Sequence, residues 1–208
     1  MKKIICLVIF CSMTLNTLAQ INSETKTEKM ERMEWWTKAR FGMFIHWGLY
    51  ALPARHEWVM SNEKMSKKTY EKYADYFDPD LYNPTQWAKL AKKAGMKYVV
   101  FTAKHHDGFT MYDSKYTDYK VTNTPYGKDV MKELVDAFRA EGIRIGLYYS
   151  LIDWHHPDFL VKDPIHPENN NKKEVAKDSS RDLKKFQKYL KNQLTEILTN
   201  YGQIDILF

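Results

Sequence analysis

Short apolar runs alternate with amphipathic helical patterns along this chain, and that order leaves few folds open to it. The segments expected to be regular are strands at 41–47, 97–103, 143–149 and 204–208, and helices at 84–94, 128–141 and 179–200. Strands this short and this apolar are typical of parallel strands that are buried on both faces. The alternation therefore predicts an α/β protein with a parallel sheet and helices outside it.

Local signals support the expected helix ends. Asn83 and Pro84 stand where a helix cap and first turn are expected, before the pattern of 84–94. Gly95 and Gly142 each follow a helical pattern directly, as residues that end helices do. The first two helices should therefore begin and end close to these positions.

The connections are unequal in length. Loops after the expected strands are long and rich in polar and aromatic residues, while loops after the helices are short. This asymmetry favours a (β/α)8 TIM barrel, whose sites lie on the loops after the strands. A doubly wound sheet would carry a glycine-rich turn after its first strand, and HWGLYALPA is not such a turn.

A full barrel needs roughly 250 residues, and three strand–helix units plus a fourth strand supply about half of one. We therefore expect the chain to be the N-terminal half of a longer barrel. A half-barrel leaves apolar strand edges uncovered, so poor solubility is expected.

The N-terminal segment has the pattern of an export signal. Residues 1–19 combine two lysines, a short apolar run and a small-residue cleavage site, and 20–30 is expected to be a flexible leader before the catalytic region 31–208. Cys6 and Cys11 both lie in the signal, so the mature chain should contain no thiolate ligand or nucleophile. We expect a periplasmic or secreted protein with no membrane segment after signal removal.

The positive charge does not indicate nucleic-acid binding. The formal net charge is +6, and the lysines are spread along the chain. A small cluster at Lys184, Lys185 and Lys188 falls in the last expected helix, where it reads as a solvated face.

Polar and aromatic residues gather just past each expected strand. They are His46, His56, Glu57 and Trp58 after the first, His105, His106 and Asp107 after the second, and Tyr148, Tyr149, Ser150, Asp153 and Trp154 at the third. In a barrel these ends converge on one pocket. Imidazoles and a carboxylate can exchange hydrogen bonds with hydroxyls, and aromatic rings can pack on the C–H face of a sugar.

Other interpretations remain open for the same residues. His46 could be a structural histidine, Glu57 a solvated loop charge, and Tyr148 or Tyr149 a core residue. His46, His105 and His106 could form a zinc site with Asp107, but the sequence has no HxH or HExxH pattern. Adjacent histidines on a strand would also point to opposite faces.

Five stretches together are similar to the catalytic domain of glycoside hydrolase family 29, the retaining α-L-fucosidases. They are FGMFIHWGLYALPA, HEW, KHHDGFTMYDSKYTDY, GIRIGLYYSLIDWHHPDF and YGQIDILF, in order over residues 31–208. The resemblance implies an exo-acting hydrolase that removes terminal L-fucose from oligosaccharides or glycoproteins. It implies no metal and no organic cofactor.

The resemblance also implies a sugar pocket, residue by residue. His46 resembles the histidine that bonds a fucose hydroxyl, and His105 and His106 resemble the paired histidines that face the ring hydroxyls. Glu57 and Trp58 resemble a polar and an aromatic wall. Tyr148, rather than Tyr149, resembles the tyrosine near the reacting centre. Both histidines can face the sugar if the chain leaves the strand between them, as the Asp107–Gly108 turn signal allows.

The catalytic carboxylates are expected elsewhere. In the family the nucleophilic aspartate follows the strand that is YGQIDILF here, so it is expected a few residues beyond Phe208, with the acid/base residue further on. Asp205 belongs to the strand and is not assigned as the nucleophile. The alternatives are a fucose-binding pseudoenzyme, a barrel hydrolase of another sugar, and a metal-dependent hydrolase.

Overall fold

The computed structural model describes residues 24–208. The predicted signal peptide lies outside these residues. The described chain divides into two compact units, one ending at Lys38 and one comprising Ala39–Phe208. Among the described residues no helix is long and apolar enough to cross a membrane.

The first unit is mainly helix α1, Lys26–Ala39, and it begins inside the segment expected as a flexible leader. A capping box explains the early start. The Thr25 backbone N–H donates to Glu28 Oε2 at 2.8 Å, and the Glu28 N–H donates to Thr25 Oγ1 at 3.2 Å. The two groups satisfy each other's free backbone donors and set the first helical turn. The last part of the expected leader is therefore helical.

The second unit is built on one parallel sheet, as expected. Its strands lie in the order of the chain: β1 Met43–Ile45, β2 Tyr98–Lys104, β3 Arg144–Tyr149 and β4 Ile206–Leu207. Each neighbouring pair is parallel. All strand carboxyl ends therefore lie at the same edge of the sheet.

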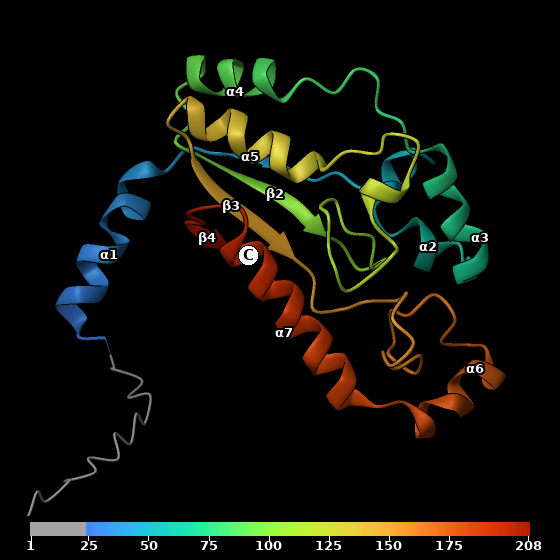
Figure 1. Ribbon diagram of the computed structural model, residues 1–208. Helices are drawn as coiled ribbons and strands as arrows, with labels where there is room; N and C mark the ends of the chain where they lie inside the picture. The colour runs from blue at the N-terminus through green and yellow to red at the C-terminus, as the bar shows by residue number, and fades with distance from the viewer. Residues whose placement is uncertain (1–23) are drawn as a thin grey trace, which may run out of the picture. The chain divides into compact units, whose positions relative to one another are not determined.

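Three longer helices connect the strands and lie around the sheet (Figure 1): α4 Pro84–Lys93, α5 Val130–Ala140 and α7 Leu183–Thr199. The Asn83 side chain accepts from the Gln86 N–H, so the predicted cap of α4 is confirmed. Gly95 and Gly142 have φ of 86° and 68°, which glycine adopts without a steric penalty. Both glycines end their helices where the sequence predicts.

Short helical segments occupy the long loops, and the last of them overlaps the start predicted for the helix at 179–200, which begins only at Leu183. They are η1 Leu49–Ala51, α2 Val59–Asn62, α3 Lys67–Glu71, η2 Lys72–Tyr76, η3 Val121–Asn123, α6 Lys172–Ala176 and η4 Lys177–Ser180. Each is shorter than the two turns that a periodic apolar pattern needs to become visible in a sequence.

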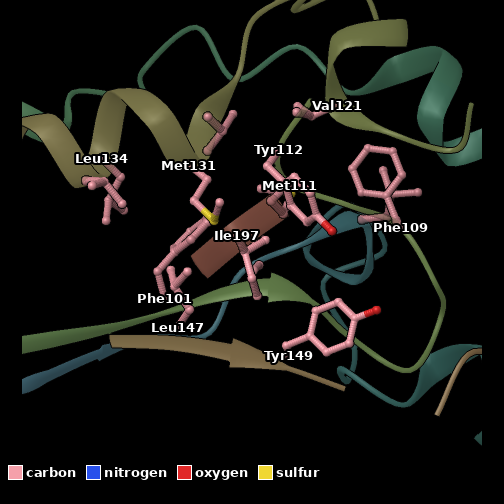
Figure 2. Close-up of a cluster of buried hydrophobic side chains, with 14 of the residues drawn as sticks. Phe101, Phe109, Met111, Tyr112, Val121, Met131, Leu134, Leu147, Tyr149 and Ile197 are labelled. Atoms are coloured by element: carbon pink, nitrogen blue, oxygen red, sulfur yellow. The ribbon is translucent and has the colours of Figure 1, made fainter. Parts of the chain in front are cut away.

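The sheet has two unlike faces. Its covered face includes Val99, Phe101, Ile145 and Leu147, which are 0–1% exposed and belong to the main apolar core. Figure 2 shows Phe101 and Leu147 grouped with side chains of the covering helices, among them Met131, Leu134 and Ile197. The core therefore sits between the sheet and α4, α5 and α7.

The other face, the open face, carries the register partners Phe44, Val100, Gly146 and Ile206 and continues to Tyr148 and Phe208. Phe44 and Phe208 are 44% and 67% exposed. Their rings pack edge to face with a centroid distance of 5.7 Å. Phe44 and Phe208 thus contact each other while remaining partly exposed, whereas Val100 on the same face is 4% exposed.

Candidate functional site

Four rings expected from the sequence to form a pocket lie together at the carboxyl edge of the sheet. His105 is central: its ring centroid lies 4.9 Å from that of His46, 4.3 Å from that of His106 and 5.8 Å from that of Tyr148. The rings of His46 and Tyr148 are 5.9 Å apart. Three loops or strand ends that are far apart in the sequence therefore meet at one place.

Strand ends explain this convergence. β1 ends at Ile45 and β2 at Lys104, so His46, His105 and His106 all follow a strand directly. The paired histidines lie in a turn rather than on alternating faces of a strand. Their rings can therefore lie on the same side, which the sequence made conditional on the strand ending there.

Trp58 lies beside His106, and Glu57 lines a pocket together with His46. The Trp58 ring meets the His106 ring edge to face at 5.2 Å. Glu57 and His46 both line an open pocket of about 380 Å³, together with Tyr50 and His56. The Glu57 carboxylate lies 3.5 Å from His56 Nδ1, and its side chain is 41% exposed. The lining of this pocket therefore combines the Glu57 carboxylate, the Arg55 guanidinium and the imidazoles of His46 and His56.

Two of the histidines are oriented by hydroxyl groups that the sequence analysis did not assign to the site. His46 Nδ1 is hydrogen-bonded to the Tyr50 hydroxyl at 2.9 Å, and His106 Nδ1 to Ser150 Oγ at 2.6 Å. The second polar atom of each ring is Nε2. Each ring is thus fixed through one nitrogen and can meet a ligand with the other.

His105 has an unpaired polar atom. Its side chain is almost fully buried, at 3% exposure, yet Nδ1 has no hydrogen-bond partner among the described residues. Buried polar atoms are normally satisfied, and an exception calls for a functional explanation.

The histidines are neutral at ordinary pH. Burial, reinforced by the neighbouring His106 and His46, lowers the pKa of His105 to about 2. Burial and the nearby His46 lower the pKa of His106 to about 4. Burial also lowers the pKa of His46, against the opposing charge of Glu57. A neutral imidazole has one N–H donor and one acceptor nitrogen, which matches the dual character of a hydroxyl.

Trp154 was noted in the sequence but not placed in the site. Its ring lies 5.5 Å from the His106 ring and 6.1 Å from the Trp58 ring. Its backbone N–H donates to the His106 carbonyl at 2.7 Å. Trp154 is 2% exposed and therefore packs behind His106 and Trp58, and its place shortly after the third strand was the sequence signal for it.

The positions of Tyr148, Tyr149 and Asp205 distinguish between the roles considered for them. Tyr149 lies on the covered face, where its hydroxyl donates to Gln193 Oε1 at 2.7 Å, while Tyr148 lies on the open face beside the histidines. Asp205 lies at the opposite edge of the sheet, where it accepts from Arg144 at 2.6 Å and from the Ile145 N–H at 3.0 Å. Asp205 is thus a structural carboxylate, consistent with its exclusion as nucleophile.

Asp107 does not face a ligand either. Its carboxylate accepts from the Tyr70 hydroxyl at 2.9 Å and from the Phe109 N–H at 3.1 Å. Burial raises the pKa of Asp107 to about 6. Over residues 24–208 no group of three or more His, Cys, Asp or Glu side chains is arranged to hold a metal ion.

Comparison with known proteins decides the family. The sequence model of a family described as alpha-L-fucosidase matches residues 9–208. This chain belongs to the alpha-L-fucosidase family.

Two solved α-L-fucosidase structures are similar to this chain over most of its length. The alpha-L-fucosidase isoenzyme 1 from Paenibacillus thiaminolyticus is 54% identical, with a TM-score of 0.83 over 86% of this chain and 42% of its own. A family 29 α-L-fucosidase from Bacteroides thetaiotaomicron, solved as a trapped covalent intermediate with 2-fluoro-fucosyl fluoride, is 37% identical, with a TM-score of 0.72 over 84% of this chain and 40% of its own.

Human plasma alpha-L-fucosidase is 36% identical over 144 residues, which are 61% of this chain and 31% of the human one. The present chain thus spans less than half the length of each of these three α-L-fucosidases.

Proposed function

We propose that the pocket of His46, His105, His106 and Tyr148 binds the terminal L-fucose of fucosylated oligosaccharides or glycoproteins, as part of a retaining α-L-fucosidase. One observation carries the proposal. Three neutral imidazoles from two different loops meet beside aromatic walls, and one of them has a buried nitrogen without a partner.

The chemistry of the pocket suits a deoxyhexose. Neutral imidazoles can both donate to and accept from ring hydroxyls. Trp58 and Tyr148 offer ring surfaces on which the C–H groups of a sugar can pack. Glu57 at the rim can accept from a further hydroxyl, and its charge is near His46.

The four strands of this chain, on this proposal, are the first four of a (β/α)8 barrel. Supporting observations are the sequential, all-parallel order β1 to β4 and the site at the strand carboxyl ends. The open face would be the interior of the barrel. A TM-score of 0.83 to the Paenibacillus α-L-fucosidase over most of the chain supports the same arrangement.

Cleavage requires two carboxyl groups about 5–5.5 Å apart in a retaining enzyme. Asp107 and Asp205 are occupied by hydrogen bonds away from the pocket, and Asp153 is buried in an ion pair with Lys104. Glu57 is the pocket carboxylate of the described chain. The proposal therefore assigns neither the nucleophile nor the acid/base residue to a carboxylate of residues 24–208, and no hydrolysis of fucosides by these residues is expected.

Calorimetry and a nitrophenyl fucoside assay test this together. The chain should bind L-fucose more tightly than D-galactose, and the His105→Ala variant should lose most of that binding. No nitrophenol should be released. Equal binding of both sugars would point to a hydrolase of another sugar. Absence of fucose binding, or turnover by the 208-residue chain itself, would contradict the proposal.

Export is also proposed, on the sequence of residues 1–19 alone. It places the chain in the periplasm or outside the cell, where fucosylated glycans would meet it. Amino-terminal sequencing of the mature chain from the native host should begin at or near Gln20.

A further inference from the structure

A fully buried ion pair lies directly beneath the paired histidines. Lys104 Nζ donates to Asp153 Oδ2 at 3.0 Å, and the two side chains are 0% and 1% exposed. The ammonium also lies 4.4 Å from the centre of the Tyr149 ring. Neither residue has a role in the site described above.

A β-bulge brings Lys104 to this position. Thr102 pairs with Tyr148, but the register shifts between Thr102 and Lys104, so that Lys104 pairs with Tyr149. Without the shift Lys104 would share the open face with Thr102. The bulge turns its side chain to the covered face instead, and it does so in the last residue before His105.

The Asp153 carboxylate connects separate segments. Its Oδ2 accepts from Lys104 and from the Tyr189 hydroxyl of α7 at 3.1 Å. Its Oδ1 accepts from the backbone N–H groups of His155 and His156 at 3.1 and 2.9 Å. One side chain thus ties the end of β2, the loop after β3 and α7 together.

The same carboxylate borders the histidine turn. A Cβ placed on Gly108, which has a φ of 81°, would lie 2.2 Å from Asp153 Oδ1. The next residue, Trp154, donates its backbone N–H to the His106 carbonyl at 2.7 Å. The turn of His105 and His106 is therefore held against the loop of Asp153 by direct contacts on two sides.

We propose that Lys104 and Asp153 are positioning residues: they set the orientation of the His105–His106 turn and of Trp154, and thereby the affinity of the pocket for its sugar. The inference about the sugar rests on the proposed function. Buried ion pairs add little net stability compared with apolar pairs of the same shape. Their hydrogen bonds do fix the orientation of the groups that they join. A binding site requires that the groups contacting the ligand be held rigidly.

The main test is the Asp153→Asn variant of the 208-residue chain. The amide retains an acceptor for the backbone N–H groups but leaves Lys104 without its counter-ion. Fucose affinity should fall roughly ten-fold, the effect of losing a charged hydrogen bond. Nitrogen and proton NMR signals of the His105 and His106 imidazoles should shift, whereas those of His56, which does not contact Asp153, should not.

Asp205→Asn is the matched control. It removes a charged carboxylate that bonds an arginine and a backbone N–H at the opposite edge of the same sheet. It should lower the free energy of unfolding while leaving fucose affinity and the imidazole signals unchanged. If it weakens binding as much as Asp153→Asn does, the effect of Asp153 is general destabilisation and the proposal is wrong.

Tyr189→Phe keeps the test valid if Asp153→Asn does not fold, because it removes a single hydroxyl and retains the ring. It should weaken fucose binding roughly three-fold and shift the His106 signals. Unchanged imidazole signals in a folded variant would overturn the proposal. If the unaltered chain binds no fucose, the proposed function fails, and the imidazole signals alone still decide whether Lys104 and Asp153 orient the turn.

Discussion

The covered and open faces of the sheet are built from the same four strands, but their side chains lie in different environments. On the covered face, Phe101 and Leu147 are fully buried against helices α4, α5 and α7. On the open face, Phe44 is 44% exposed and lies next to His46 and Tyr148, with ring centroids 5.8 and 6.3 Å away. Alternation along each strand sends successive side chains to these two environments.

The difference separates stability from binding. Apolar burial on the covered face supplies the cohesion of the unit, since it is there that the large side chains leave water. The open face contributes less burial and carries polar rings at its carboxyl end. Groups that must meet a ligand are thus kept off the face that holds the fold together.

The largest expected effect is on the covered face. Phe101→Ala should lower the free energy of unfolding by about 3–5 kcal/mol, because the fully buried ring would leave a cavity between the sheet and the helices. Phe44→Ala, the same change on the open face, should cost about 1 kcal/mol or less, because nearly half of the ring is already in water. Urea denaturation of both variants measures the difference.

Similar losses of unfolding free energy in the two variants would contradict the expected difference between the covered and open faces. They would mean that the open face is as tightly packed in solution as the covered one. The slope of the urea transition should stay the same in both variants, because neither changes the surface exposed on unfolding by much.

The second expected effect concerns the histidines at the end of the open face. The folded-state pKa of His105, about 2, lies below its unfolded value near 6.5. Folding then excludes a proton that the unfolded chain binds, so the stability that the neutral ring contributes is present above pH 6.5 and is lost as pH falls below it. The loss is about 1.4 kcal/mol per pH unit for such a group.

The shifted pKa of Asp107 has the opposite effect on how folding stability depends on pH. Its folded-state pKa of about 6 exceeds the unfolded value near 3.9, so acidification from pH 6 toward pH 4 favours the folded chain at this residue. His105 and His106 together outweigh it. Unfolding measured from pH 7 to 4.5 should show falling stability, and His105→Gln should flatten the curve. An unaltered slope in that variant would mean that His105 is charged in the folded chain.

Much of the covered face could be predicted from the sequence, because its causes are local. The cap at Asn83, the glycine at 95 and the apolar periodicity of α5 and α7 each lie within a few residues of the feature that they specify. The helix α1 was missed although its capping box, Thr25 with Glu28, is equally local. The signal is visible in the sequence as Thr25 three residues before Glu28.

The support of the site could not be predicted in the same way. His46, His105 and His106 were candidates because they follow strands that must be neighbours, whereas Tyr148 was preferred to Tyr149 only on the resemblance to the α-L-fucosidases. The Lys104–Asp153 pair depends on a register shift within β2, which moves a lysine to the opposite face, and no local pattern indicates the shift. The bonds of Tyr50 to His46 and of Ser150 to His106 depend on side-chain geometry in loops.

A smaller loss of stability is expected when the cap of a covering helix is removed. Asn83→Ala should lower the free energy of unfolding by about 1 kcal/mol, because the first turn of α4 loses the acceptor for the Gln86 N–H at 3.0 Å. Asn171→Ala, which removes the cap of α6, is the control. Since α6 has no buried residue and lies outside the core, its fraying should leave the global transition nearly unchanged. Equal effects in urea denaturation would mean that α6, and not only α4, is part of the cooperative unit.

The smallest expected change in stability accompanies a change in association. Phe44 and Phe208 are exposed by 44% and 67%, and their rings contact each other on the open face of the sheet. Exposed apolar surface of this kind favours self-association. The Phe44→Ala chain should therefore be more monomeric than the unaltered chain in light scattering at equal concentration.

Tyr76→Ala removes a ring that is 74% exposed but lies in η2, away from the sheet, and it should leave association unchanged. If both changes reduce association equally, the open face has no special part in it, and general surface apolarity is the cause.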